Sequence, residues 1–305
     1  MTIALIGTGA MASLLAARLS TISPVVMVGS WAAQIAAVNE QGLWLEEADG
    51  LRTHFPTVWA TDQPEQAGPV KLAFILVKSW QTAAAAERTA RLLQPDGLAI
   101  SLQNGWGHLE TLTAVLGTRQ VTAGVTSEGA NLLAPGVVRH AGRGVTYLGY
   151  DADNETQVAA AAGWLQQAGF DVWLEANLAG LIWRKLVVSS AINPLTALLR
   201  LPNGELLQRP SARRLMWALA EETAAVAQAA GIQLPPGDPA AWVEEVAAAT
   251  APNRSSMLQD MERGTPTEIE AISGAIVRQA EAAQTAAPLN QTMYELILAA
   301  TYQQT

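Results

Sequence analysis

The sequence predicts an α/β Rossmann domain, with a doubly wound and mostly parallel sheet, followed by an all-α domain. Three observations support this prediction. A glycine-rich turn follows the first apolar run, apolar runs alternate with helical patterns up to about residue 174, and strand-like runs are absent beyond that point. We therefore expect a dinucleotide-binding domain over residues 1–175 and a helical substrate domain over residues 176–305.

The first half of the chain has the rhythm of a parallel sheet covered on both faces. The strands expected in it cover residues 3–6, 25–28, 43–45, 55–59, 72–77, 98–102 and 121–126. The helices expected between them cover residues 10–19, 31–39 and 81–93. Two further runs, residues 137–140 and 145–148, are bounded by turn residues and predict a hairpin appended to this sheet.

The second half is dominated by long stretches of alanine, leucine, glutamate and glutamine. The breaks between these stretches have turn chemistry, as in Leu201-Pro202-Asn203-Gly204. The helices expected here cover residues 176–199, 206–230, 240–249, 254–262, 266–283 and 289–303. Their apolar surface would allow a homodimer, and it would serve equally well as the core of a monomer.

Composition narrows the class of protein. The 305 residues include no cysteine, which excludes disulfides and cysteine metal sites and fits a cytoplasmic protein. A net charge of −9 repels phosphate backbones, so we expect no nucleic-acid partner. No basic flank accompanies the apolar start and no apolar run could span a bilayer, so we expect neither a secretory signal nor a membrane partner. Three widely spaced histidines argue against a metal site.

A glycine fingerprint for dinucleotide binding opens the chain between Thr2 and Ala12. Its first glycine permits a tight turn, its second lets the backbone approach a pyrophosphate, and Ala12 takes the third small position. No Lys-Ser or Lys-Thr follows, so it is not an NTP-binding loop. A purely structural glycine turn is the alternative. The residues expected to hold the cofactor phosphates at the helix N-terminus are Gly7, Thr8, Gly9, Ala10 and Met11.

The end of the second strand indicates which dinucleotide binds. NAD-binding proteins usually place an acidic residue there, but here Val28-Gly29-Ser30-Trp31 is followed by no acidic residue before Glu40. An acid would repel a 2′-phosphate, so its absence favours NADP(H) over NAD(H). Ser30 could bond that phosphate and Lys78, after the strand at 72–77, could supply charge. The alternatives are an ordinary loop serine and a solvated lysine.

Residues with suitable chemistry also follow a later strand and line one predicted helix. Asn104 follows the strand at 98–102 and is expected near the nicotinamide, although Asn-Gly is also a common turn. Lys185, Ser189 and Asn193 are spaced i, i+4, i+8 and share one helix face. Apolar neighbours can lower the pKa of such a lysine, which suits a general acid. Periodicity alone favours the alternative of a lysine that reaches solvent at an exposed edge.

Two later helix starts contain further polar residues. Thr265, Pro266 and Glu268 match a capping box, which gives Glu268 a structural interpretation. Ser255 and Ser256 could likewise cap a helix. Both interpretations are compatible with a site, because capped helix starts present donors and acceptors.

These segments resemble the ketopantoate reductase (2-dehydropantoate 2-reductase) family over essentially the whole chain. The family implies a Rossmann domain joined to a helical domain, with the active site in the cleft between them. It also implies NADPH-dependent reduction of ketopantoate to pantoate, on the route to pantothenate and coenzyme A. The motifs that show the resemblance are Gly7-x-Gly9, Lys78, Gln103-Asn104-Gly105, Trp183-x-Lys185, Asn193-Pro194-Leu195-Thr196-Ala197, Pro202-Asn203-Gly204-Glu205 and Ser255-Ser256-Met257-Leu258-Gln259-Asp260, with Glu268 following.

The resemblance also implies roles for single residues. Lys185 matches the catalytic lysine and Glu268 the active-site glutamate, which is also expected at the cofactor. The substrate-binding residues expected by this resemblance are Asn104, Ser189, Asn193, Asn203 and Ser256. In addition to the residues of the glycine turn, the residues expected to bind the cofactor are Ser30, Lys78, Asn104 and Glu268.

Three positions depart from the family pattern. Ala12 replaces the usual third glycine, and Ser30 stands where the family often has an arginine for the 2′-phosphate. Ser189 stands where many members have an asparagine, and a hydroxyl cannot reproduce the amide's geometry. A reductase of a different 2-oxo acid therefore stays open as an alternative, as does a non-catalytic nicotinamide-binding regulator. The retained Lys185 and Glu268 argue against the regulator.

Overall fold

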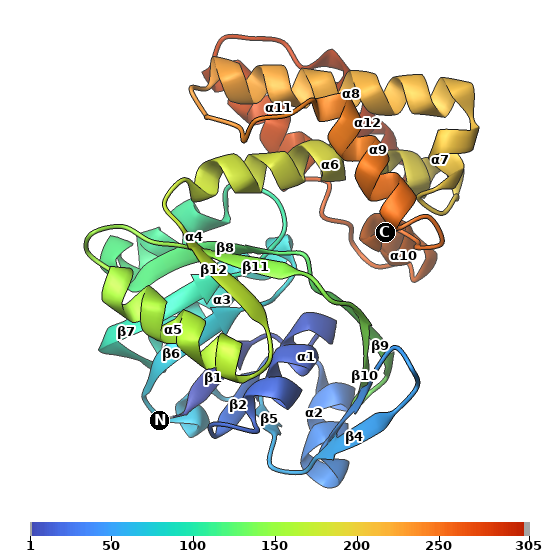
Figure 1. Cartoon of the computed structure of the whole chain (residues 1–305). Helices are drawn as coiled ribbons and strands as arrows, with labels where there is room; N and C mark the ends of the chain where they lie inside the picture. The colour runs from blue at the N-terminus through green and yellow to red at the C-terminus, as the bar shows by residue number, and fades with distance from the viewer. Residues whose placement is uncertain (1, 302–305) are drawn as a thin grey trace. The chain divides into compact units, whose positions relative to one another are not determined.

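The computed structural model describes residues 2–301 and divides them into two compact units. The first unit comprises residues 2–103 and 108–178, drawn from blue to yellow-green in Figure 1. The second comprises residues 179–301 together with the short segment 104–107 from the first half of the sequence. Within residues 2–301, no helix has the length and apolar character needed to cross a membrane.

An eight-stranded sheet forms the centre of the first unit (Figure 1). Its order is β5-β2-β1-β6-β7-β8-β11-β12; the β8–β11 pair is antiparallel and the other pairs are parallel. The predicted doubly wound, mostly parallel sheet is therefore confirmed. The strands are β1 (Ile3–Ile6), β2 (Val25–Val28), β5 (Trp59–Thr61), β6 (Val70–Ile75), β7 (Leu93–Ser101), β8 (Val121–Thr126), β11 (Val145–Gly149) and β12 (Asp171–Glu175).

Helices cover both faces of this sheet, and β1 shows why its sequence is continuously apolar. Ile3 and Leu5 join one buried cluster, whereas Ala4 and Ile6 join another. Successive side chains of a strand point to opposite faces, so a strand buried on both faces needs an unbroken apolar run. The helices of this unit are α1 (Ala10–Leu19), α2 (Ala32–Gln41), α3 (Thr82–Ala90), α4 (His108–Leu116) and α5 (Glu155–Gln167), with short 3₁₀ turns η1 (Pro64–Ala67), η2 (Ser79–Gln81) and η3 (Thr118–Gln120).

A second, four-stranded sheet has the order β4-β3-β10-β9. Its strands are β3 (Leu43–Glu46), β4 (Arg52–Phe55), β9 (Gly129–Ala134) and β10 (Val137–Gly142). The predicted hairpin between residues 137–140 and 145–148 is wrong, because β10 pairs with β9 and β3 while β11 pairs with β8 and β12. The tight turn lies instead at Gly136, whose positive φ of 76° joins β9 to β10.

Other predicted boundaries also differ from the structure. The single strand expected over residues 55–59 is two strands in different sheets, because Pro56 follows β4 and has no amide hydrogen for a ladder. The helix expected over residues 81–93 ends at Ala90, and Leu93 already begins β7. The sequence reasoning did not identify β9, β12, α4 or α5.

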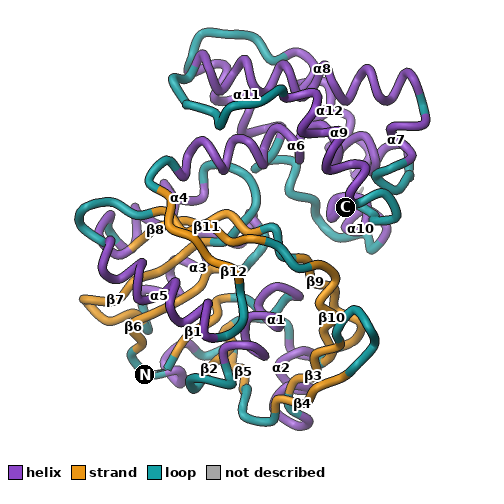
Figure 2. The backbone as a smooth tube through the Cα atoms, in the orientation of Figure 1, coloured by secondary structure: helices purple, strands orange, loops and turns teal. Residues whose placement is uncertain are grey.

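Helices and loops make up residues 179–301 (Figure 2). The predicted helix over residues 206–230 is two helices, because Arg209 is extended before Pro210, which then begins the second. Residues 302–303 of the last predicted helix lie outside the described residues. The helices, beginning with one that starts just before this range, are α6 (Leu178–Leu199), α7 (Glu205–Gln208), α8 (Pro210–Ala229), α9 (Pro239–Ala249), α10 (Ser256–Glu262), α11 (Ser273–Ala282) and α12 (Pro288–Thr301).

The predicted helix over residues 266–283 begins only at Ser273, and the predicted capping box is absent. The Thr265 hydroxyl donates to the carbonyl of Asp260 at 3.2 Å instead of accepting from a helical amide. Glu268 lies in the turn before α11, where its backbone carbonyl accepts from the amides of Ala271 and Ile272. Glu268 is therefore not at the third position of a helix, as the capping box would require.

Buried polar contacts join helix α6 to its neighbours in the second unit. Ser190 and Thr223 share a hydrogen bond of 2.9 Å, and the Asn290 side chain donates to Thr223 at 3.1 Å. Glu222 of α8 accepts from the backbone amides of Leu289 and Asn290, at 2.9 and 2.7 Å. These bonds satisfy the first amides of α12 and join α6, α8 and α12.

Candidate functional site

The two glycines of the N-terminal turn have different structural requirements. Gly7 has a φ of 135°, and a Cβ there would lie 3.1 Å from the backbone of Leu76. Gly9 has an ordinary φ of −84° as the N-cap of α1, and a Cβ there would meet nothing within 4 Å. Gly7 is therefore required by the fold, whereas Gly9 leaves open space beside the helix N-terminus. Such space is what the approach of a pyrophosphate requires.

The glycine turn lies where the strand order of the main sheet reverses. Beyond β1 the chain continues to β2 and β5 on one side and to β6 and β7 on the other. Ligands of doubly wound sheets bind at this point, outside the carboxyl ends of the strands. Lys78 follows β6 here, partly exposed, with its amine 6.0 Å from the ring of Trp80. The structure thus brings the predicted phosphate-binding turn and Lys78 to adjacent strand ends.

The remaining predicted cofactor residues of this unit also follow β1 and β2. Thr8 is buried, and a Cβ on Gly29 would lie 2.7 Å from its side chain, so Thr8 packs against the end of β2. Ala10 and Met11 are partly exposed in the first turn of α1, and Ser30 is exposed. These residues and the open space at Gly9 fit a bound dinucleotide.

The predicted helix face exists on α6. Lys185, Ser189 and Asn193 are each partly exposed, while most residues between them are buried. Burial lowers the pKa of Lys185 to about 8, because an ammonium loses hydration there, and attraction to Glu268 opposes this shift. Glu268 itself is only 4% exposed. The lowered pKa favours the proton-donor interpretation of Lys185 over the solvated lysine that periodicity alone favoured.

The two predicted helix-start serines differ in role. Ser255 is the N-cap of α10: its hydroxyl oxygen accepts from the Leu258 amide at 3.1 Å and from the Thr196 hydroxyl at 2.7 Å. Ser256, the next residue, is exposed and available to a ligand. The cap therefore joins α10 to α6 and sets the position of Ser256.

Asn203 is turned toward the protein. Its side-chain amide donates to the Thr250 hydroxyl at 2.8 Å, and its backbone amide donates to the carbonyl of Asn253 at 2.9 Å. It is 8% exposed, so these contacts hold the loop that leads to α10. A direct contact between Asn203 and a substrate stays a prediction.

The segment around Asn104 includes residues that the sequence reasoning left without a role. Gln103 is buried, and its side-chain amide donates to the Val77 carbonyl at 3.2 Å and to the Thr82 hydroxyl at 2.8 Å. Trp106 donates its backbone amide to the carbonyl of Ala271 at 2.9 Å. The position of Trp106 directly after Asn-Gly was the only available sequence clue.

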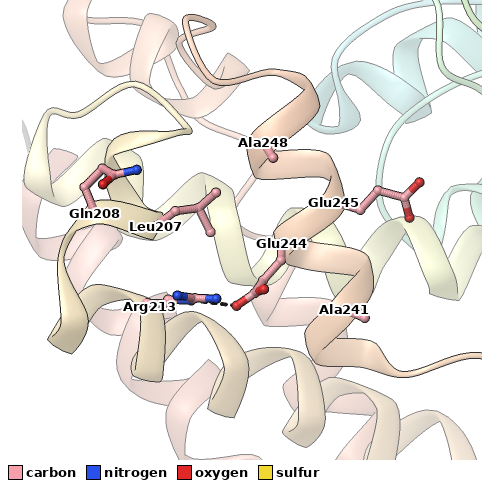
Figure 3. Close-up of a pocket in the computed structure, with 7 residues that line it drawn as sticks. All are labelled: Leu207, Gln208, Arg213, Ala241, Glu244, Glu245 and Ala248. Carbon is pink, nitrogen blue, oxygen red and sulfur yellow. Dashed lines mark hydrogen bonds and ion pairs between the residues drawn. The ribbon is translucent and has the colours of Figure 1, made fainter.

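One further hollow of about 540 Å³ lies between α7, α8 and α9 (Figure 3). Arg213 and Glu244 face each other in it at 2.6 Å, so the two charges compensate. Its lining includes none of the predicted site residues. We assign a candidate cofactor-binding region to the glycine turn of the first unit and, separately, a candidate catalytic region to the α6 face of the second unit.

Two family models match the chain. The model described as "Ketopantoate reductase PanE/ApbA" matches residues 3–153, and its C-terminal counterpart matches residues 177–301. The 2-dehydropantoate 2-reductase of Archaeoglobus fulgidus is 36% identical over 96% of this chain and 95% of that protein. The same enzyme of Halobacterium salinarum is 35% identical over 95% of this chain and 96% of that protein.

Solved structures have the same fold. A PanE/ApbA family ketopantoate reductase from Ralstonia eutropha has a TM-score of 0.90 and 30% identity, covering 99% of this chain and 98% of that one. D-mandelate dehydrogenase with NADH and anilino(oxo)acetate has a TM-score of 0.92 and 26% identity, with the same coverage. Family models that together span both units and relatives above 30% identity confirm the resemblance. The chain belongs to the ketopantoate reductase family.

Proposed function

We propose that this protein reduces ketopantoate to pantoate with NADPH. The observation that supports this most strongly is Lys185, partly buried on α6 with its pKa lowered to about 8 and attracted to Glu268. By the resemblance, both residues match the family's catalytic positions, and relatives that cover nearly the whole chain are 2-dehydropantoate 2-reductases.

In this proposal the first unit holds the dinucleotide. The backbone at Gly7 to Met11 takes the pyrophosphate at the N-terminus of α1, and Lys78 and Ser30 take the 2′-phosphate of the adenosine. When bound, the nicotinamide supplies the hydride for the ketone carbon. Asn104, after β7, contacts the nicotinamide and the substrate.

Lys185 is the proton donor in this proposal. As hydride reaches the ketone carbon, negative charge develops on the carbonyl oxygen, and an ammonium beside that oxygen stabilises and then protonates it. Burial keeps the lysine acidic enough to release its proton, while Glu268 keeps it protonated near neutral pH. Burial and attraction to Glu268 thus act in opposite directions on the pKa of the Lys185 amine, and together they set how readily it gives up its proton.

The proposed substrate contacts come from the same helical unit. Asn193 and Ser189 lie on the partly exposed face of α6 with Lys185, and Ser256 is exposed at the start of α10. Amide and hydroxyl groups at these positions suit the hydroxyl and carboxylate of a 2-oxo acid. Asn203 completes this set as a predicted contact.

We propose NADPH rather than NADH because the end of β2 has no acidic residue, and we place the protein in the cytoplasm on its lack of cysteine. A specific observation also keeps a second substrate class in view. By the resemblance, Ser189 stands where many family members have an asparagine, and D-mandelate dehydrogenase, which has the same fold, is solved with NADH and anilino(oxo)acetate.

A parallel assay tests these proposals. Oxidation of NADPH and of NADH is followed with ketopantoate and with a panel of 2-oxo acids that includes aryl compounds. We expect the highest kcat/KM with ketopantoate and NADPH. A higher kcat/KM with an aryl 2-oxo acid would replace the proposed substrate, and cofactor binding without any turnover would favour a regulator.

A further inference from the structure

The four residues Asn104–Gly107 follow a strand of the first unit but pack with the second. Gln103, immediately before them, is held in the first unit by its bonds to Val77 and Thr82. His108, immediately after them, is buried in the first unit at the start of α4. The segment that contains Asn104, the asparagine expected at the nicotinamide, is therefore a short part of the first half of the chain that packs with the helical unit.

Contacts with Ala271 and with Trp183 hold this segment in the second unit. The Trp106 amide donates to the carbonyl of Ala271 at 2.9 Å, and Gly105 lies so close to Ala271 that a Cβ on it would be 2.4 Å from the same carbonyl oxygen. The Trp106 ring meets the ring of Trp183 edge to face, with centroids 5.7 Å apart and planes at 62°. This arrangement is a favourable aromatic geometry.

The two partners of the segment are close in sequence to the proposed catalytic pair. Trp183 is fully buried two residues before Lys185 on α6. Ala271 follows Glu268 by three residues, and its amide donates to the Glu268 carbonyl at 3.1 Å. The contacts of Gly105 and Trp106 are therefore made to the same two segments that present the lysine and the glutamate.

We infer that Trp106 is a positioning residue that fixes Asn104 relative to Lys185 and Glu268. This inference rests on the proposed function. Trp106 acts through its contacts with Trp183 and Ala271 and does not itself bind the reactants. Packing inside the helical unit sets the position of Asn104. The residue that contacts the nicotinamide and Lys185, the proton donor, are therefore held together in the same unit. Misplacement of a reacting group by about 1 Å can cost about a hundredfold in rate.

Three variants test this inference against the parent. In Trp106→Ala the ring contact is lost, and we expect kcat with ketopantoate to fall about 10- to 100-fold while the Kd for NADPH alone stays within about twofold. Trp106→Phe keeps an aromatic ring and should restore most of the rate. Trp173→Ala removes a tryptophan that is 61% exposed on β12 and should leave kcat unchanged.

Hydrogen exchange of the segment gives a readout that does not depend on turnover. The amide of Trp106 is bonded to Ala271 in the parent, and its protection should fall in Trp106→Ala but persist in Trp106→Phe. Unchanged protection in Trp106→Ala would overturn the inference even if the parent proved inactive. An active parent with an unchanged kcat in Trp106→Ala would also overturn it, whereas an inactive parent with lost protection would refute only the proposed function.

Discussion

The pH dependence of Glu268→Gln gives a quantitative test of how the site sets the acidity of Lys185. Burial lowers the pKa of Lys185 from 10.5 to about 8, and attraction to the Glu268 carboxylate limits that fall. Proton donation needs the ammonium, so we expect kcat/KM of the parent to decline as the pH rises through about 8. Replacing the carboxylate with an amide removes the attraction, and an opposite charge at close range is worth about one pH unit or more.

The expected difference between parent and variant therefore grows with pH. If the pKa of Lys185 is lower by about one unit in the variant, the amine is almost fully protonated in both enzymes near pH 6. At pH 8 the protonated fraction in the variant is then about fivefold lower than in the parent. The ratio of parent to variant kcat/KM should rise by about that factor between the two pH values. A constant offset, by contrast, reflects any lost substrate contact.

The matched control is Glu270→Gln. Glu270 is exposed two residues away, and its carboxylate bonds to Tyr294 and Arg278. The same replacement of a carboxylate by an amide at Glu270 should leave the decline of kcat/KM at about pH 8. The reasoning is refuted if Glu268→Gln shows a descent at the parent's pH, or if Glu270→Gln moves it equally.

Two further predictions concern the first unit. Gly9→Ala should change Tm by no more than about 2 °C, because the added Cβ meets no atom within 4 Å, yet raise the Kd for NADPH at least about tenfold by occupying the pyrophosphate's approach; calorimetry and titration check this, and unaltered binding would contradict it. Burial lowers the pKa of His108 from 6.5 to about 4, so the folded state resists a proton that the unfolded state accepts, and stability is lost as the pH falls from about 6.5 to 4. Between pH 7 and pH 4 the parent should lose up to about 3 kcal/mol more free energy of unfolding than His108→Leu, as measured by urea unfolding at the two pH values. Equal losses in the two proteins would exclude the effect.

Periodicity and glycine spacing predicted the architecture well because both report local geometry. The run at residues 3–6 is apolar throughout since both faces of β1 are covered, and the turn after it needs a positive φ at Gly7. Strand pairing was predicted less well. The residues of β10 are compatible with a partner on either side, and only the tertiary structure places them beside β3 and β9.

The candidate site shows the same division. The shared face of Lys185, Ser189 and Asn193 follows from helical spacing alone. The capping box at Thr265 was wrong because its residues match a local pattern that the fold does not use, as Thr265 bonds backward to Asp260. The contacts of Trp106 join segments far apart in the chain, so its place directly after Asn-Gly could not show which residues it meets.

Hydride transfer in a single turnover of Lys185→Met is the most direct measurement of the central claim, that the α6 lysine protonates the reduced ketone. Enzyme preloaded with NADPH is mixed rapidly with ketopantoate, and the Kd for NADPH is measured separately. We predict a rate lower by about a hundredfold, equivalent to about 3 kcal/mol of lost stabilisation, with the Kd within about twofold of the parent. Hydride transfer at the parent's rate would contradict the account.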